Sequence, residues 1–318
     1  MKPIEIAGAK VSAIGLGTAQ FGAGVPERDA FAQLDRFVEA GNLVDTAHVY
    51  SDWIPGETSR SERVIGRWLH SRGGRARVFI STKGAHPRFE RMDVPRLSPG
   101  EIESDLLGSL KCLQTDYIDL YFLHRDDPGR PVGEILETLE AHRRAGRIRA
   151  YGCSNWTLGR LAEARDYAAA HGMAGFCCNQ LLWSLAAVNP AGVDDPTLVA
   201  MDGPTWRFHR DAGLPAMAYM AAAGGWFAHR QRGDTGDALR RRYDTPENEV
   251  TYARLLPLSR ESGLSLTALS LAWFAAAPFP AAALASFSRP AQLEEAARLL
   301  ETELDPTLID ALGKAKGI

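Results

Sequence analysis

Short apolar runs alternate along this chain with stretches in which apolar residues recur at helical spacing. Each apolar run is bounded by glycine, proline or polar residues, which is typical of a buried strand. The predicted strands lie at residues 14–17, 43–44, 78–82, 120–123, 148–152, 176–179, 215–219 and 281–285. The predicted helices lie at residues 27–40, 61–69, 99–113, 131–145, 158–170, 204–212, 249–262, 266–276 and 292–302.

Smaller signals fill the intervals between these elements. Two short apolar runs at residues 4–6 and 10–13, joined by Ala-Gly-Ala, predict a β-hairpin before the first strand. Residues 98–101, Ser-Pro-Gly-Glu, have the form of a helix start with serine as the N-cap residue. Residues 224–248 are polar and rich in glycine and arginine, and we interpret them as an insertion after the seventh strand.

Strict alternation of strands and helices is the signature of a parallel sheet covered by helices. The pattern contains eight such units with no break in composition, so we expect one domain over residues 1–318. Eight units favour closure into a (β/α)8 barrel, an α/β fold for which this length is ordinary. An open, doubly wound sheet is the alternative architecture.

The overall composition narrows the possible partners. The formal net charge is −3, from 36 basic and 39 acidic residues, which gives no reason to expect a nucleic acid or an anionic membrane as partner. No apolar run approaches the roughly 20 residues of a membrane span, and the first residues lack a hydrophobic signal segment, so a cytoplasmic protein is expected. The cysteines form no C-x-x-C pair and are interpreted as small buried residues, at positions 112, 153, 177 and 178.

Glycines in the first strand raise the question of a dinucleotide-binding fingerprint. Gly15 and Gly17 match the first two glycines of G-x-G-x-x-G, but Gln20 stands where the third is needed. The motif therefore fails. We interpret these glycines as allowing close backbone approach at the rim of a pocket.

Polar residues stand where the predicted strands end. In a barrel these ends meet on one face, where reacting groups are found. Tyr50 follows the second strand end by five residues, so a phenol joins the acid, amine and imidazole supplied by the strand ends themselves. Together these groups predict a proton-transfer site. In chain order the strand ends carry Gly17-Thr18, Asp45, Lys83, His124, Ser154-Asn155, Gln180 and Tyr219.

Five sequence blocks resemble the signature blocks of the aldo-keto reductases, in family order and at family-like spacing. They are Val-Asp-Thr-Ala-His-Val-Tyr at 44–50, Ile-Ser-Thr-Lys at 80–83, Asp-Leu-Tyr-Phe-Leu-His at 119–124, Gly-Cys-Ser-Asn at 152–155 and Cys-Asn-Gln at 178–180. The resemblance extends from residue 15 to about residue 300. It implies a (β/α)8 barrel that binds a nicotinamide cofactor without a Rossmann motif and reduces an aldehyde or ketone to the alcohol.

The resemblance also implies a catalytic tetrad of Asp45, Tyr50, Lys83 and His124. Tyr50 would give a proton to the carbonyl oxygen as hydride arrives. Since an ordinary phenol has a pKa of about 10, we expect the Lys83 cation to lower the pKa of Tyr50. Asp45 would hold the lysine, and His124 would orient the substrate carbonyl. No metal is required by this chemistry.

For the cofactor, the resemblance assigns Ser154, Asn155 and Gln180 to the nicotinamide carboxamide and the ring of Tyr219 to the nicotinamide face. Gly17, Thr18 and Asp45 complete that end. Ser288 and Arg289 are placed for a 2′-phosphate, and Gln292 and Glu295 for phosphate and adenine. The helix predicted to start near Gln292 would add a dipole that favours an anion.

The chain also departs from the family pattern. Ala296 and Ser286 replace residues usual at the adenosine end, and residues 220–224 replace a Ser-Pro-Leu run. Because Arg289 is present, NADP is the expected cofactor, with NAD as the alternative.

The substrate is less constrained by the sequence. Aromatic residues near predicted strand ends suit either apolar carbonyls or sugar faces, and a small carbonyl compound is the expected partner. A cofactor-sensing subunit and a physiological alcohol or sugar dehydrogenase are the other functions considered, and the oligomeric state is open. The candidate pocket residues are Phe21, Trp53, Phe89, Trp183, Trp206 and Trp226.

Overall fold

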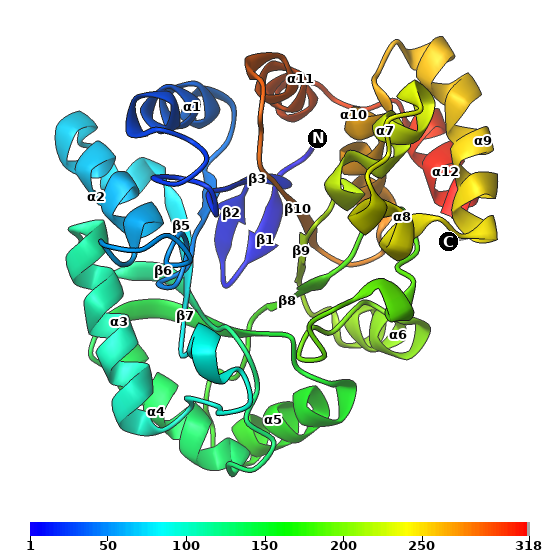
Figure 1. The fold of residues 1–318 in the computed structure, drawn as a ribbon. Helices are drawn as coiled ribbons and strands as arrows, with labels where there is room; N and C mark the ends of the chain where they lie inside the picture. The colour runs from blue at the N-terminus through cyan, green and yellow to red at the C-terminus, as the bar shows by residue number, and fades with distance from the viewer. Residues whose placement is uncertain (317–318) are drawn as a thin grey trace.

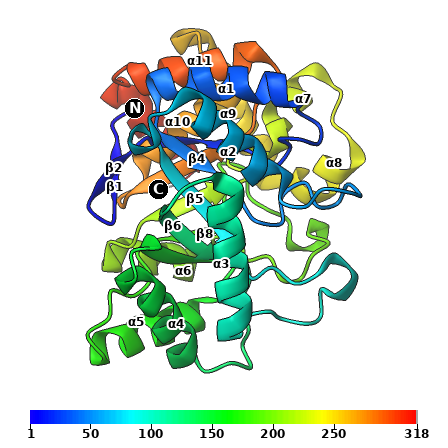
Figure 2. The same cartoon turned by 90° about the vertical axis from the view of Figure 1, so that its left-hand side faces the viewer.

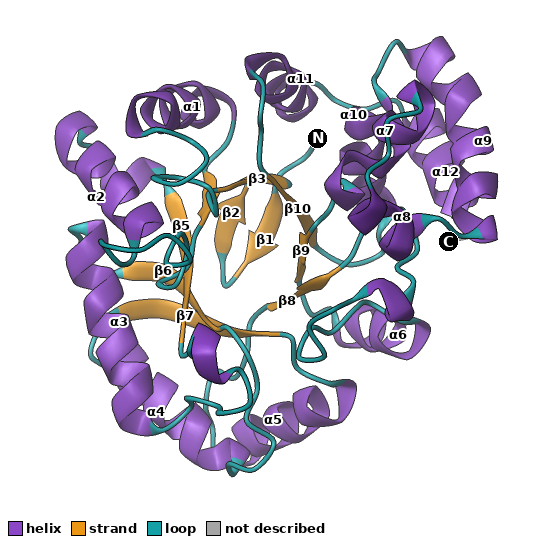
Figure 3. Ribbon diagram, viewed as in Figure 1, coloured by secondary structure: helices purple, strands orange, loops and turns teal. Residues whose placement is uncertain are grey.

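The computed structural model describes residues 1–316. Within that range eight strands close into a barrel, each hydrogen-bonded in parallel to its neighbours in the order β10-β3-β4-β5-β6-β7-β8-β9 (Figures 1 and 3). This confirms the (β/α)8 architecture and excludes the open sheet. The strands are β3 (Ile14–Gly17), β4 (Leu43–Asp45), β5 (Phe79–Gly84), β6 (Ile118–Leu123), β7 (Ile148–Ser154), β8 (Asn179–Leu182), β9 (Ala216–Tyr219) and β10 (Ala281–Ala285).

Helices surround the barrel, with α1, α2 and α3 seen from the side in Figure 2. Their apolar stripes face inward: α1, for example, buries Ala30, Leu34 and Phe37 against the strands. The helix start at residues 98–101 is a capping box, as predicted. The covering helices are α1 (Glu27–Ala40), α2 (Arg60–Arg72), α3 (Pro99–Leu113), α4 (Val132–Arg144), α5 (Leu158–Ala170), α6 (Gly203–Ala212), α9 (Pro246–Ser262), α10 (Leu266–Ala272) and α11 (Pro290–Glu301).

The predicted hairpin forms the floor of the barrel. Strands β1 (Ile4–Ile6) and β2 (Ala9–Val11) pair antiparallel and cross the barrel opening in Figure 1. Ile6 and Val11 are fully buried against side chains that point into the barrel, such as Phe122 and Met217. Because this end is plugged by apolar side chains, the polar chemistry is confined to the opposite end.

The structure differs from the sequence interpretation, or adds to it, in three places. Residues 224–248 contain α7 (Trp226–Arg232), α8 (Asp237–Tyr243) and the start of α9, since a few aromatic side chains there are buried. A further helix, α12 (Pro306–Lys316), follows the last one predicted. The sixth strand begins at Asn179, not residue 176, so Cys177 and Cys178 precede it, with Cys178 buried and Cys177 half-buried.

Short 3₁₀ helices complete the connections, and the predicted helix at 266–276 is α10 followed by one of them. Within residues 1–316, no helix is both long enough and apolar enough to cross a membrane. The 3₁₀ helices are Arg75–Arg77, Phe89–Arg91, Pro190–Gly192, Ala223–Gly225 and Trp273–Ala276.

The close contact between α2 and α3 yields a test of the packing. A Cβ atom on Gly66 of α2 would lie 2.1 Å from the carbonyl oxygen of Cys112 on α3, so the helices would have to separate. We predict that Gly66→Ala lowers the free energy of unfolding by about 1–3 kcal/mol, measured by urea denaturation. Gly159→Ala on α5 is the control, because a Cβ there meets nothing within 4 Å. Equal stability of Gly66→Ala and the wild type would contradict this packing.

Candidate active site

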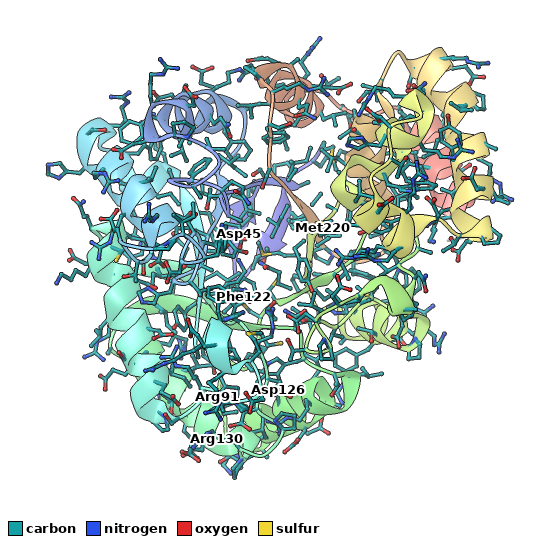
Figure 4. The ribbon with its side chains drawn as sticks, in the orientation of Figure 1. Asp45, Arg91, Phe122, Asp126, Arg130 and Met220 are labelled. Carbon is teal, nitrogen blue, oxygen red and sulfur yellow. The ribbon has the colours of Figure 1, made fainter. Side chains whose placement is uncertain are left out.

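The polar strand ends meet in a cavity of ≈ 230 Å³ at the carboxyl end of the barrel. Asp45 and Met220, which both line it, lie on opposite sides of the barrel centre in Figure 4. The parallel register explains the gathering, because every strand delivers its last residue to the same rim. The predicted residues that line this cavity are Gly17, Thr18, Asp45, Tyr50, His124, Ser154, Asn155, Gln180 and Tyr219.

Lys83 is the centre of the site. It lies in β5 with a side chain only 1% exposed, and its ammonium donates to Asp45 Oδ2 at 2.6 Å and to the Thr46 carbonyl at 2.8 Å. The third contact of the ammonium is with the Tyr50 hydroxyl oxygen, at 3.2 Å. The lysine therefore uses all three of its donors, and Tyr50 keeps its own O–H proton available for another acceptor.

The Asp45 carboxylate is fixed through both oxygens. While Oδ2 accepts from Lys83, Oδ1 accepts from the Ser81 hydroxyl at 2.7 Å and from the Gln180 side-chain amide at 3.0 Å. A buried carboxylate with every side engaged cannot rotate freely. The position of the lysine is thus set by strands on both sides of the barrel.

Burial controls the acid–base state of Tyr50. Burial raises the pKa of the phenol, and the neighbouring Lys83 cation lowers it by less, so the pKa of Tyr50 lies above its ordinary value. Lys83 thus acts in the predicted direction, but the larger effect of burial, which the sequence did not predict, raises the net pKa. For Lys83, burial lowers the pKa, but Asp45 and Tyr50 outweigh it and the pKa is raised. At neutral pH the site holds a charged lysine and a protonated tyrosine.

His124 follows β6 directly and is held neutral. Its ring centroid lies 5.8 Å from that of Tyr50 and 4.7 Å from that of His86. Burial, together with His86, Arg125 and Lys83, places the pKa of His124 well below its ordinary value. Its Nδ1 atom is buried and has no hydrogen-bond partner among residues 1–316. The imidazole is therefore uncharged at neutral pH and can offer one N–H to a substrate oxygen.

The opposite wall of the cavity is built around Asn155. This residue follows β7 in a left-handed conformation with φ 61°, and its amide nitrogen donates to the Ser154 hydroxyl and the His124 carbonyl. Its side-chain oxygen accepts from the Tyr219 hydroxyl at 2.6 Å. The ring of Tyr219 is thus fixed at the cavity wall by its hydroxyl, in a position compatible with the predicted stacking role.

A second cavity, of ≈ 470 Å³, continues from the first. The two cavities adjoin, because Met220, Leu284 and Ser286 line both, and we call the pair the extended groove; its lining residues run from the tetrad to the start of α11. Ser288 and Arg289 line its far end, as the sequence predicts for an anion-binding position.

Gln292 and Glu295 differ in their surroundings. Gln292 lines the groove, and its side-chain oxygen accepts from the backbone nitrogens of Ser288 and Arg289. Glu295 is not among the lining residues, because its carboxylate accepts from the backbone nitrogen and hydroxyl of Ser265 at the start of α10. The structure therefore brings Gln292 to the groove and directs Glu295 away from it.

The candidate aromatic residues mostly lie elsewhere. Phe21, Trp183 and Trp226 are buried in the core, and Trp206 packs against Phe279. Trp53 and Phe89, by contrast, are 46% and 44% exposed. Phe89 packs on His86 and lines a separate cavity of ≈ 260 Å³ beside Lys83.

Several residues at these cavities were not found from the sequence. Arg125, directly after His124, is buried at the tetrad cavity, where it donates to the His124 carbonyl and pairs with Asp195. His229 and Arg232 of α7 line the second cavity together with Arg289. A charged residue directly after a strand end was a usable signal for Arg125, whereas the role of α7 required the fold. Within residues 1–316, no group of three or more His, Cys, Asp or Glu side chains is arranged to hold a metal ion.

The closed parallel barrel carries a carboxylate, a lysine and a histidine at its strand ends and a tyrosine in the loop after β4. This arrangement is typical of barrel enzymes with a proton-transfer site. The sequence profile described as "Aldo/keto reductase family" matches residues 13–316, so the chain belongs to the aldo/keto reductase family and is an oxidoreductase. This confirms the resemblance read from the sequence blocks.

Individual relatives agree with this assignment. The uncharacterised oxidoreductase YrpG of Bacillus subtilis (strain 168) is 30% identical over 314 residues, covering 96% of this chain and 92% of YrpG. Norsolorinic acid reductase stcV of Emericella nidulans is 35% identical over 199 residues, 56% of this chain and 48% of that protein. The crystal structure of an aldo-keto reductase from Klebsiella pneumoniae in complex with NADPH superposes with a TM-score of 0.69 at 25% identity, covering 98% of this chain and 94% of that one.

The raised pKa of Tyr50 can be measured directly. We predict that ultraviolet titration of tyrosinate in the protein without cofactor shows a transition above about pH 10 that Tyr50→Phe removes. Lys83→Met should move this transition to still higher pH, because the cation is the main influence that lowers the pKa. A Tyr50 transition below about pH 9, or one that Lys83→Met leaves in place, would contradict the described electrostatics.

Proposed function

We propose that this chain is an NADP(H)-dependent carbonyl reductase that converts an aldehyde or ketone to the alcohol, with Tyr50 as proton donor. The observation that carries the proposal is the direction of the bond between Lys83 and Tyr50. The ammonium donates to the phenol oxygen at 3.2 Å, so the phenol proton is left to hydrogen-bond a carbonyl oxygen in the cavity. A general acid placed in this way contributes about 10²–10⁴-fold to a rate.

The other tetrad residues support this proton transfer. As the proton leaves Tyr50, the Lys83 charge stabilises the phenolate, and Asp45 keeps the ammonium in place. His124, as a neutral imidazole, donates a hydrogen bond that orients the carbonyl oxygen toward Tyr50. Burial keeps both donors in the protonation state that the reduction needs at neutral pH.

The extended groove fits a nicotinamide dinucleotide. When bound, the cofactor supplies hydride. Ser154, Asn155 and Gln180, with Gly17 and Thr18, provide the polar wall for the nicotinamide end, and Tyr219 provides an aromatic face. The NADPH complex of the Klebsiella pneumoniae relative supports this choice of cofactor.

At the other end of the groove we assign Ser288 and Arg289 to a 2′-phosphate and Gln292 to the adjoining phosphate and adenine. Glu295 has the separate task of fixing the start of α10. Arg289 makes NADP the preferred cofactor over NAD, because a guanidinium recognises a phosphate dianion strongly.

Trp53 and Phe89 are the exposed aromatic side chains available to a substrate, which we propose is a small carbonyl compound. A cofactor-sensing subunit would not need the O–H of Tyr50 to be left available. We therefore prefer the enzyme to the sensor.

The role of Tyr50 is tested by removing only its hydroxyl. We predict that Tyr50→Phe binds NADPH as the wild type does, measured by fluorescence titration, but loses at least about 10²-fold in kcat with a panel of aldehydes and ketones. Turnover close to that of the wild type would eliminate Tyr50 as the proton donor.

Cofactor preference is tested at the far end of the groove. We predict that Arg289→Ala weakens NADPH binding by about 10–100-fold and changes NADH binding little, because a charge-assisted bond to phosphate contributes about 1.5–3 kcal/mol. Arg298→Ala is the matched control, because Arg298 lies within α11, the helix that Arg289 precedes, but outside the groove lining. An equal loss for both cofactors would contradict a 2′-phosphate site at Arg289.

A further inference from the structure

Glu62 of α2 is a buried charge that the proposed chemistry does not use. Its side chain is 0% exposed. One carboxylate oxygen accepts from the Thr82 hydroxyl at 2.6 Å, and the other lies 2.9 Å from Nδ1 of His48. Burying a carboxylate is costly unless it is paired and hydrogen-bonded, so both partners are needed to keep it there.

The two partners of Glu62 belong to the two segments that carry the proton donor and its lysine. Thr82 directly precedes Lys83 in β5, and His48 precedes Tyr50 by two residues in the loop after β4. The same segments also meet through their backbones, where the amide of His48 donates to the Lys83 carbonyl at 2.8 Å. One carboxylate thus connects the strand of the ammonium with the loop of the phenol.

The His48 ring is held on the side of its Nδ1 atom, with its side chain 26% exposed. The Ser59 and Ser109 hydroxyls lie 3.2 and 3.4 Å from Nδ1. On α3, a Cβ atom added to Gly108 would lie 2.7 Å from the ring, so α3 packs directly against it. The ring therefore connects Glu62 and α3 with the backbone of the loop.

The Glu62 carboxylate favours the protonated form of His48. Burial lowers the pKa of His48, but Glu62, with smaller contributions from Asp105 and Asp52, outweighs this effect and raises it above the ordinary value. The contact between Nδ1 and the carboxylate at 2.9 Å thus connects α2 with the loop of Tyr50.

We propose that Glu62 is a positioning residue that sets the spacing between the Tyr50 hydroxyl and the Lys83 ammonium by holding Thr82 and His48 at once. It touches neither substrate nor cofactor and acts only through these two side chains. The expected change in kcat rests on the proposed function, whereas the spacing between Tyr50 and Lys83 does not.

Glu62→Gln tests the proposal, because it keeps the shape of the side chain and removes the charge. Replacing one acceptor oxygen by an NH2 group breaks one of the two contacts of the carboxylate and lets the Tyr50 loop move relative to β5. Misplacement by about 1 Å can cost about 10²-fold in rate. We expect kcat for carbonyl reduction to fall about 10–100-fold, while KM and NADPH affinity stay within about twofold. Thr82→Val, which removes only the hydroxyl donor to Glu62, should change kcat in the same direction by a smaller factor and serves if Glu62→Gln does not fold.

A second readout needs neither substrate nor cofactor. As the phenol moves away from the Lys83 cation, the tyrosinate transition assigned to Tyr50 should shift to higher pH in Glu62→Gln. This measurement keeps the inference separate from the proposed function, since it can succeed or fail even if no carbonyl compound is turned over.

Glu140→Gln is the control for a merely structural effect. Glu140 of α4 is also buried, at 3% exposure. Its carboxylate accepts hydrogen bonds from Arg143 and Tyr151, neither of which is a tetrad residue. The proposal requires both variants to lose thermal stability and only Glu62→Gln to lose kcat and shift the Tyr50 transition. An unchanged kcat and Tyr50 transition in Glu62→Gln, or the same changes in Glu140→Gln, would overturn it.

Discussion

The site depends on one buried ion pair, between Asp45 and Lys83. The two charged atoms lie 2.6 Å apart, and the side chains are 3% and 1% exposed. An unpaired charge at this depth would be strongly destabilising, so each residue requires the other. The remaining hydrogen bonds of the pair position its neighbours. The ammonium also contacts Tyr50, and the carboxylate is fixed by Ser81 and Gln180.

Around that pair the protein places groups that burial keeps uncharged. The pKa of Tyr50 is raised and that of His124 is strongly lowered, in both cases mainly by desolvation. A protonated phenol can donate its proton to a carbonyl oxygen, and a neutral imidazole keeps one N–H that can donate a hydrogen bond to the same oxygen. Apolar side chains fill the floor of the barrel, so the polar groups meet at its carboxyl end.

Much of this arrangement could be predicted from the sequence, because the carboxyl ends of all strands in a (β/α)8 barrel lie on the same face. Asp45, Lys83 and His124 each end an apolar run, and Tyr50 follows one closely, so their meeting followed from the topology alone. The helices α7 and α8 were missed because each has only seven residues, too few for an apolar repeat to be recognised. The longer α12 was also missed, although its apolar residues recur at helical spacing. Trp226 stood near a strand end like a pocket residue, but the unpredicted α7 and α8 bury it.

Contacts between distant segments were beyond the reach of sequence patterns. Glu295 accepts from Ser265 and does not line the groove, and Glu62 contacts both Thr82 and His48. These partners cannot be identified from sequence spacing. The net pKa of Tyr50 likewise depends on how far burial outweighs a cation, which requires the packed structure.

The most direct test of the proposed carbonyl reduction follows the transferred hydride through one turnover. NADPH carrying deuterium at the reactive position of the nicotinamide ring would be mixed with an excess of the protein and a reducible carbonyl compound in ordinary water, and the product analysed by mass spectrometry. We predict one deuterium on the carbinol carbon of the product, with the hydroxyl proton coming from the protein and solvent. A product without deuterium on that carbon would contradict it.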